Sequence, residues 1–163
     1  MDFKDAVRKS MELADFMVEK YVTDLTPEEM LTRPVPEANH VAWQLGHLIA
    51  AERMLVEGGV PGSMPPLPAG FAERHNKDTA KSDKPGDFLT KDEYLKLAKE
   101  IRAATLKVLD SAPNTDFDKP VTGKVPPFVQ SIGDCFVTVG SHWTMHAGQW
   151  VALRRKLHRE VMF

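Results

Sequence analysis

Two histidines stand four residues apart near the end of the chain, at His142 and His146. Residues four apart on an α-helix lie on one face, one turn from each other, so both imidazoles can reach a single metal ion. A third histidine, His47, lies among apolar residues in an earlier segment. Together they would give a three-nitrogen site with an open coordination position, which is typical of catalytic zinc. Because soft sulfur ligands are absent, nickel, iron and manganese are alternatives.

Several polar residues near these histidines are candidates for catalytic roles. Gln44, Glu52, Ser141 and Gln149 are close in sequence and can orient an imidazole or handle a proton. Glu52 is unusual because it falls within an apolar helical stripe. His75 lies in a polar segment and could approach the site as a mobile residue. The competing interpretation is that the histidines are core residues with satisfied hydrogen bonds and bind no metal.

Other catalytic arrangements are weaker or absent. Cys135 precedes His142 by two helical turns, about 10 Å along a helix axis, so we expect a buried, inert thiol. The sequence contains no phosphate-binding glycine loop, no Gly-x-Ser-x-Gly elbow and no His-Glu-x-x-His motif. These absences direct attention to the three histidines.

Composition predicts an ordinary cytoplasmic domain without a nucleic-acid or membrane partner. The 163 residues include 21 Lys+Arg and 23 Asp+Glu, a net charge of −2, and one cysteine, which excludes an internal disulfide. No segment approaches the roughly 18 apolar residues of a membrane span, and the N-terminus is amphipathic rather than a signal peptide. Basic residues gather near the C-terminus, where we expect a helix end whose dipole favours cations: Arg154, Arg155, Lys156, His158 and Arg159.

Four segments show the 3.6-residue apolar period of helices, and none alternates at period two. They are expected at about 2–23, 39–57, 90–113 and 131–157. Capping signals support these limits: Thr26 precedes a short turn, Asn39 begins the second long helix, and Thr90 and Ser131 begin the next two. This pattern therefore predicts an all-α protein, a four-helix bundle with one domain over 1–163. Bundles of this kind commonly hold metal or ligand sites between facing helices.

Two long connections interrupt the helical pattern, at 58–89 and 114–130. The first is dense in proline and glycine and then polar and charged. A loop of this length inside a domain is expected to be a lid, a partner contact or a mobile segment.

Three pieces of the sequence together resemble the DinB-like family of bacterial four-helix-bundle proteins. They are NHVAWQLGHLIAAE (39–52), GSMPPLPAGFAERH (62–75) and GSHWTMHAGQWVALRRKL (140–157). The resemblance covers essentially the whole chain. It implies a divalent metal bound by His47, His142, His146 and water, and a homodimer formed by packing helices of two bundles. Members of the wider superfamily look like thiol S-transferases or isomerases that use bacillithiol or mycothiol.

Three functional hypotheses follow. The first is a metal-dependent enzyme that performs thiol transfer or hydrolysis on a small molecule, with zinc or nickel as metal and a low-molecular-weight thiol as candidate co-substrate. The second is a non-catalytic metal-binding or stress-response protein whose coordination is closed by a fourth ligand, either His75, Glu52 or Gln149. The third is a helical scaffold without metal. A fold resemblance by itself does not choose among them.

Overall fold

The computed structural model describes residues 1–162 and is all-α, which confirms the predicted fold class. Within these residues there is no strand, and an isolated bridge joins Pro120 to Ser131. The five α-helices of this part of the chain are α1 (Phe3–Val22), α2 (Pro27–Met30), α3 (Val41–Gly59), α4 (Lys91–Ser111) and α5 (Ile132–Lys156). Three short 3₁₀ turns lie between them: η1 (Glu73–His75), η2 (Pro85–Asp87) and η3 (Asn114–Asp116). None of the helices in residues 1–162 combines the length and hydropathy needed to cross a bilayer.

Local capping explains where the helices begin. Thr26, Thr90 and Ser131 each accept a backbone hydrogen bond from the residue three positions on, whose acidic side chain bonds back to the cap. These predicted caps are confirmed. The prediction of Asn39 as the cap of α3 is wrong, because the cap is His40, whose Nδ1 accepts the Trp43 N–H at 3.1 Å.

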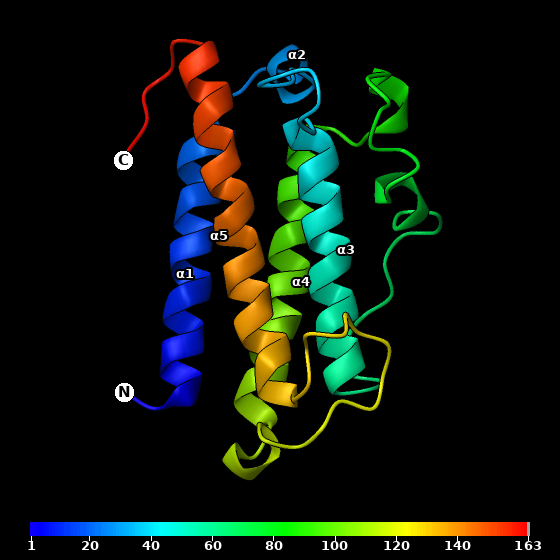
Figure 1. Ribbon diagram of the computed structural model, residues 1–163, viewed down its shortest axis with the longest axis vertical. Coiled ribbons are helices and arrows are strands. Elements are labelled where there is room, and N and C mark those ends of the chain that lie inside the picture. Colours follow the sequence, from blue (N-terminus) through cyan, green and yellow to red (C-terminus); the bar gives the residue numbers. More distant parts are fainter. Residues whose placement is uncertain (163) are drawn as a thin grey trace.

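The long helices α1 and α5 run in one direction, and α3 and α4 run in the other (Figure 1). α5 packs on both α1 and α3, and α3 packs on α4, whereas α1 and α4 contact each other only sparsely. Since α3 and α4 are parallel neighbours, no short loop can join the end of one to the start of the other. The segment 60–90 therefore returns along the length of the bundle as a crossover connection, which accounts for its length.

The crossover is held along α3 by specific hydrogen bonds. Trp43 Nε1 donates to the carbonyl of Asn76 at 3.2 Å, and His40 Nε2 lies 3.0 Å from the carbonyl of Ser82. Because His40 Nδ1 already accepts a backbone N–H, its Nε2 carries the proton and donates to Ser82. These contacts give the crossover fixed partners on the helix that carries His47.

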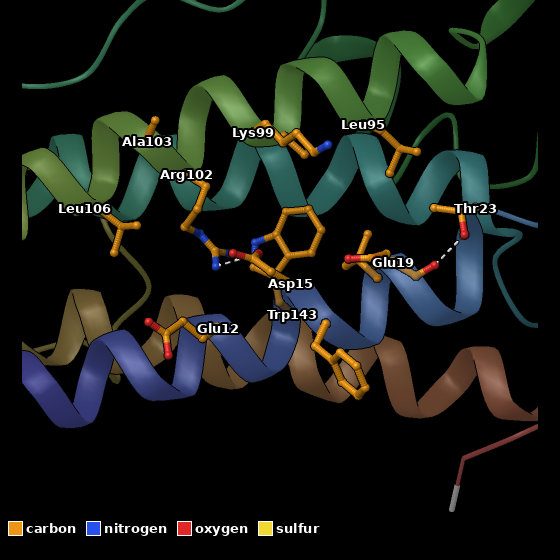
Figure 2. A pocket seen from close by; sticks show the side chains of 13 residues that line it. Glu12, Asp15, Glu19, Thr23, Leu95, Lys99, Arg102, Ala103, Leu106 and Trp143 are labelled. Atoms are coloured by element: carbon orange, nitrogen blue, oxygen red, sulfur yellow. Dashed lines mark hydrogen bonds and ion pairs between the residues drawn. The ribbon is translucent and has the colours of Figure 1, made fainter.

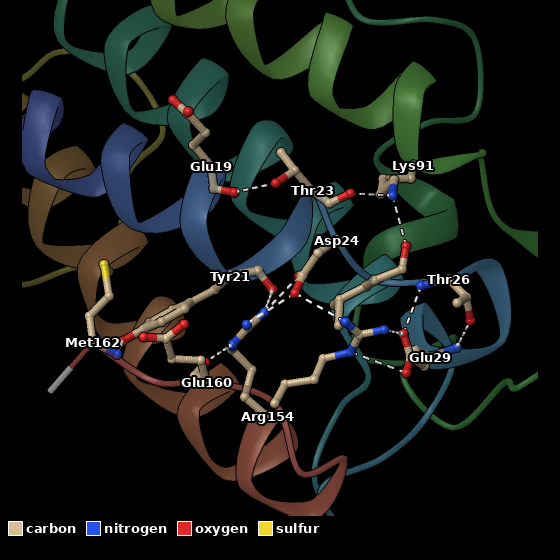
Figure 3. Close-up of polar contacts among 12 residues, drawn as sticks. Glu19, Tyr21, Thr23, Asp24, Thr26, Glu29, Lys91, Arg154, Glu160 and Met162 are labelled. Carbon is tan, nitrogen blue, oxygen red and sulfur yellow. Dashed lines mark hydrogen bonds and ion pairs between the residues drawn. The ribbon is translucent and has the colours of Figure 1, made fainter.

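Two basic residues, one in the last turn of α5 and one just after it, are paired with acids that follow α1 or lie in α2 (Figure 3). Arg154 donates from Nη1 to Asp24 at 2.7 Å and to the carbonyl of Tyr21 at 3.1 Å. Arg159 donates from Nη2 to Glu29 at 2.7 Å. Two of the predicted helix-end cations therefore join α5 and the following residues to α1 and α2.

Candidate metal centre

The structure brings the three predicted histidines together between α3 and α5. One ring nitrogen from each of His47, His142 and His146 lies within 4.8 Å of the others. His146 is buried, whereas His47 and His142 are half-buried, so the cluster reaches the molecular surface. The antiparallel packing of α3 on α5 places the single histidine opposite the pair.

The cluster fits a divalent metal in both spacing and donor type. His142 Nε2 and His146 Nε2 are 3.2 Å apart. Zinc–nitrogen bonds of 2.0–2.1 Å at a tetrahedral angle would separate two ligand nitrogens by about 3.3 Å. Among residues 1–162, no carboxylate or thiol joins this group. Three imidazoles are suitable donors for zinc and equally for nickel or iron, and less selectively for manganese.

All three imidazoles are held in their neutral form. Burial, together with the neighbouring His47, lowers the pKa of His142 to about 4. Burial and then the other two histidines lower the pKa of His146 to about 3. The pKa of His47 is also lowered by burial, with partial compensation from the backbone of His75. Neutral imidazoles each retain a nitrogen lone pair, which is the form that binds metal.

Gln44 fixes the tautomer of His146. Trp150 Nε1 can only donate, and it lies 2.9 Å from Gln44 Oε1, while Gln44 Nε2 donates to the carbonyl of Asn39 at 2.5 Å. The atom of Gln44 that faces His146 Nδ1 at 2.9 Å is therefore the carbonyl oxygen, so Nδ1 carries the proton. His146 Nε2 is left with its lone pair directed toward His142 Nε2.

His47 is oriented by the helix turn before it and by the crossover. The ring of Trp43 stacks on the ring of His47, with centroids 4.9 Å apart and an interplanar angle of 8°. Trp43 is itself bound to the crossover through Asn76. The crossover thus contributes to the metal centre through Trp43, which packs on one of the ligands, and through the backbone of His75.

His75 is placed beside the centre but has no free ring nitrogen. Its Nδ1 lies 2.7 Å from the carbonyl of Phe71, and its Nε2 lies 2.6 Å from the hydroxyl of Tyr94. The ring packs on Gly46, where an added Cβ would come within 2.1 Å of His75 Cδ2. His75 therefore fastens η1 to α3 and α4, and the structure does not bring it into the three-histidine group.

Glu52 is likewise outside the group, in a buried ion pair. Its Oε1 and Oε2 accept from Arg102 Nε and Nη2 at 2.9 and 3.0 Å, and Oε2 also accepts from Trp143 Nε1 at 2.7 Å. Glu52 falls within an apolar helical stripe, and a carboxylate that is buried there requires a partner. Local sequence patterns do not identify Arg102, 50 positions away, as that partner.

Gln149 and Cys135 lie at opposite extremes of exposure. Gln149 is exposed, less than one turn after His146, and its side chain slightly raises the pKa of that histidine. Of Glu52, His75 and Gln149, it is therefore the one whose side chain lies at the centre. Cys135 is fully buried, and burial raises the pKa of its thiol to about 11, as expected for an inert thiol.

A comparison with known protein families assigns this chain to a family. Residues 12–150 match the DinB superfamily. The chain belongs to the DinB superfamily. This superfamily is metal-binding in general, and all three clustered histidines lie within the matched segment of this member. No curated protein matches the chain.

Proposed function

We propose that this DinB superfamily member is a metal-dependent enzyme. In this proposal His47, His142 and His146 hold a divalent ion, zinc or nickel first, whose remaining positions accept water or a low-molecular-weight thiol. The observation that supports it is the cluster itself: three neutral imidazoles at a half-buried position, with no fourth protein ligand among the described residues. Such a donor set leaves coordination open.

When bound, the ion would lower the pKa of a coordinated water or thiol and so supply a nucleophile near neutral pH. Three neutral ligands leave its positive charge uncompensated, which favours the anionic form of the nucleophile. The protein keeps His146 in the correct tautomer through Gln44 and supports His47 through Trp43. In this proposal the exposed side chain of Gln149 contacts the substrate at the solvent-facing side of the metal centre. The proposed reaction is thiol transfer to a small electrophile, or hydrolysis.

Metal analysis tests the site directly. Untagged protein purified without chelator or nickel resin should contain about one divalent ion per chain. His142→Ala should lose it, while His158→Asn should retain it. His158 lies outside the cluster with φ of 55°, where asparagine is better tolerated than alanine. Wild-type protein that is metal-free and takes up none on addition would refute the proposed site.

Catalysis needs a separate test, because a metal site can be non-catalytic. Turnover of electrophiles with low-molecular-weight thiols should be lost after chelation and restored by metal. Turnover that persists after chelation would exclude the metal from the mechanism. In cobalt-substituted protein, azide should change the visible spectrum, because it can enter an open position. An unchanged spectrum would favour a closed, non-catalytic metal site.

A further inference from the structure

A groove opens between α1 and α4, which contact each other only sparsely. Its volume is about 570 Å³, which is within the range of small-molecule sites. Figure 2 shows Trp143 of α5 standing between the two helices at the base of the groove, beside Arg102. None of the three clustered histidines lines it. The groove is therefore a different site from the metal centre.

The walls of the groove combine apolar surface with an acidic stripe. Phe16, Leu95 and Leu106 are among the apolar residues that line its sides. On α1, three acids recur at intervals of three and four residues and face the groove: Glu12, Asp15 and Glu19. Across from them, α4 offers Lys99 and Arg102. The acids therefore outnumber the bases along the groove.

The cation Arg102 is shared between Asp15 and the buried Glu52, so it neutralises the stripe only in part. Its guanidinium is bound by both oxygens of Glu52, by Asp15 Oδ1 at 2.8 Å and by the carbonyl of Met11 at 3.1 Å. Within residues 1–162, Asp15 Oδ2 receives no hydrogen bond, and this side chain is 51% exposed. Burial and the nearby acids Glu52 and Glu12 raise the pKa of Asp15 despite Arg102. A further positive charge at this point would be favourable.

We propose that this groove binds an amphipathic organic cation, an alkyl or aromatic body with an ammonium-type head. The body would lie against Phe16, Leu95 and Leu106, and the head would lie against Asp15 and Glu19. A second copy of the chain is a poorer occupant. A two-fold interface centred on the groove would bring the two acidic stripes together.

Binding of three ligands with one chain length tests the proposal. Octyltrimethylammonium, octanol and octanoate carry heads of charge +1, 0 and −1, and the quaternary ammonium has no lone pair with which to ligate a metal. By calorimetry below micelle concentrations, the cation should bind at least about tenfold more tightly than octanoate, as expected for desolvated charge complementarity. Equal affinities, or no binding of the cation at millimolar concentration, would overturn the proposal.

Variants locate the binding. Ala103→Phe fills the groove from an exposed position on α4, so it should abolish binding without disturbing the core. Glu19→Gln should weaken binding of the cation several-fold but not of octanol. Glu100→Gln removes the same charge from an exposed position outside the groove and should change nothing. Unaltered binding in Ala103→Phe, or a dimer that this variant dissociates, would show that the groove is not the cation site.

Discussion

At the scale of single residues, groups that can only donate or only accept a hydrogen bond determine which nitrogen of His146 carries the proton. The indole of Trp150 and the carbonyl of Asn39 leave one orientation for the Gln44 amide, and that orientation protonates His146 at Nδ1. A ligand histidine whose other nitrogen is held in this way needs no rearrangement before it binds metal. The preorganisation comes from uncharged groups, which keeps the centre neutral.

Replacing Gln44 should weaken metal binding. In Gln44→Leu, His146 Nδ1 and Trp150 Nε1 lose their acceptor, so the zinc Kd should rise about 10- to 100-fold. The unsatisfied buried donors should also lower the free energy of unfolding by about 1–3 kcal/mol. Competition titration with a chromophoric chelator and urea unfolding measure the two effects. Gln44→Glu retains the acceptor and should retain metal, and an unchanged Kd in Gln44→Leu would contradict the assigned role.

Replacing Glu52 distinguishes a structural role of this residue from a catalytic one. It is 1% exposed and joins α3 to Arg102 of α4 and Trp143 of α5. Glu52→Ala leaves Arg102 buried with only Asp15 as a charged partner, which should cost about 3 kcal/mol or more. Urea unfolding should show this loss, while metal stoichiometry in the folded protein stays unchanged. A variant of full stability that has lost turnover would instead make Glu52 catalytic.

At the scale of elements, the crossover is required by the topology, and it also packs beside the metal centre. It runs along α3 because α3 and α4 are parallel. It contacts the first turns of α3, near His47, at two points: Asn76 accepts a hydrogen bond from Trp43, and the ring of His75 packs on Gly46. Close approach is allowed by Gly46, where any side chain would collide with the His75 ring. A glycine in mid-helix lowers helix propensity, so its presence here has a packing reason.

Two glycine substitutions should have opposite effects. Gly46→Ala should displace His75 and lower the free energy of unfolding by about 1–3 kcal/mol through overpacking. Gly148→Ala has nothing within 4 Å of the new Cβ and should raise it by about 0.5–1 kcal/mol. Urea unfolding of both proteins, with hydrogen exchange over 70–80, is the measurement. Equal stabilities would mean that the crossover does not depend on contact at Gly46.

At the scale of the whole molecule, five of the six histidines are buried or half-buried and have a lowered pKa. Burial is the first cause of a lowered pKa at five positions, spread over the metal centre, the α3 cap and the crossover: His40, His47, His75, His142 and His146. Protonation of the native state is therefore opposed throughout the bundle. The implied homodimer remains a prediction, which light scattering of the purified protein can check.

The buried histidines predict a loss of stability in mild acid. The unfolded chain takes up protons near the ordinary histidine value of 6.5, whereas His142 and His146 resist protonation until about pH 4 and 3. Between these limits the unfolded state binds more protons, so the free energy of unfolding falls as pH falls. Asp15 has the opposite effect, because its raised pKa makes the native state bind a proton more readily than the unfolded state. The urea midpoint of metal-free protein should drop between pH 7 and pH 5, and a constant midpoint would refute the prediction.

The sequence by itself determined the helical segments, most of their caps and the proximity of His142 to His146, because these depend on residues three or four positions apart. It also placed His47 in the cluster through a family resemblance. Only the tertiary structure decided that α3 and α4 are parallel, that His40 rather than Asn39 caps α3, and that Arg102 neutralises Glu52. It also showed that His75 lies in the crossover with both nitrogens occupied, and that Gln44 orients His146. Each of these depends on contacts between elements, which are fixed by packing and burial rather than by local periodicity.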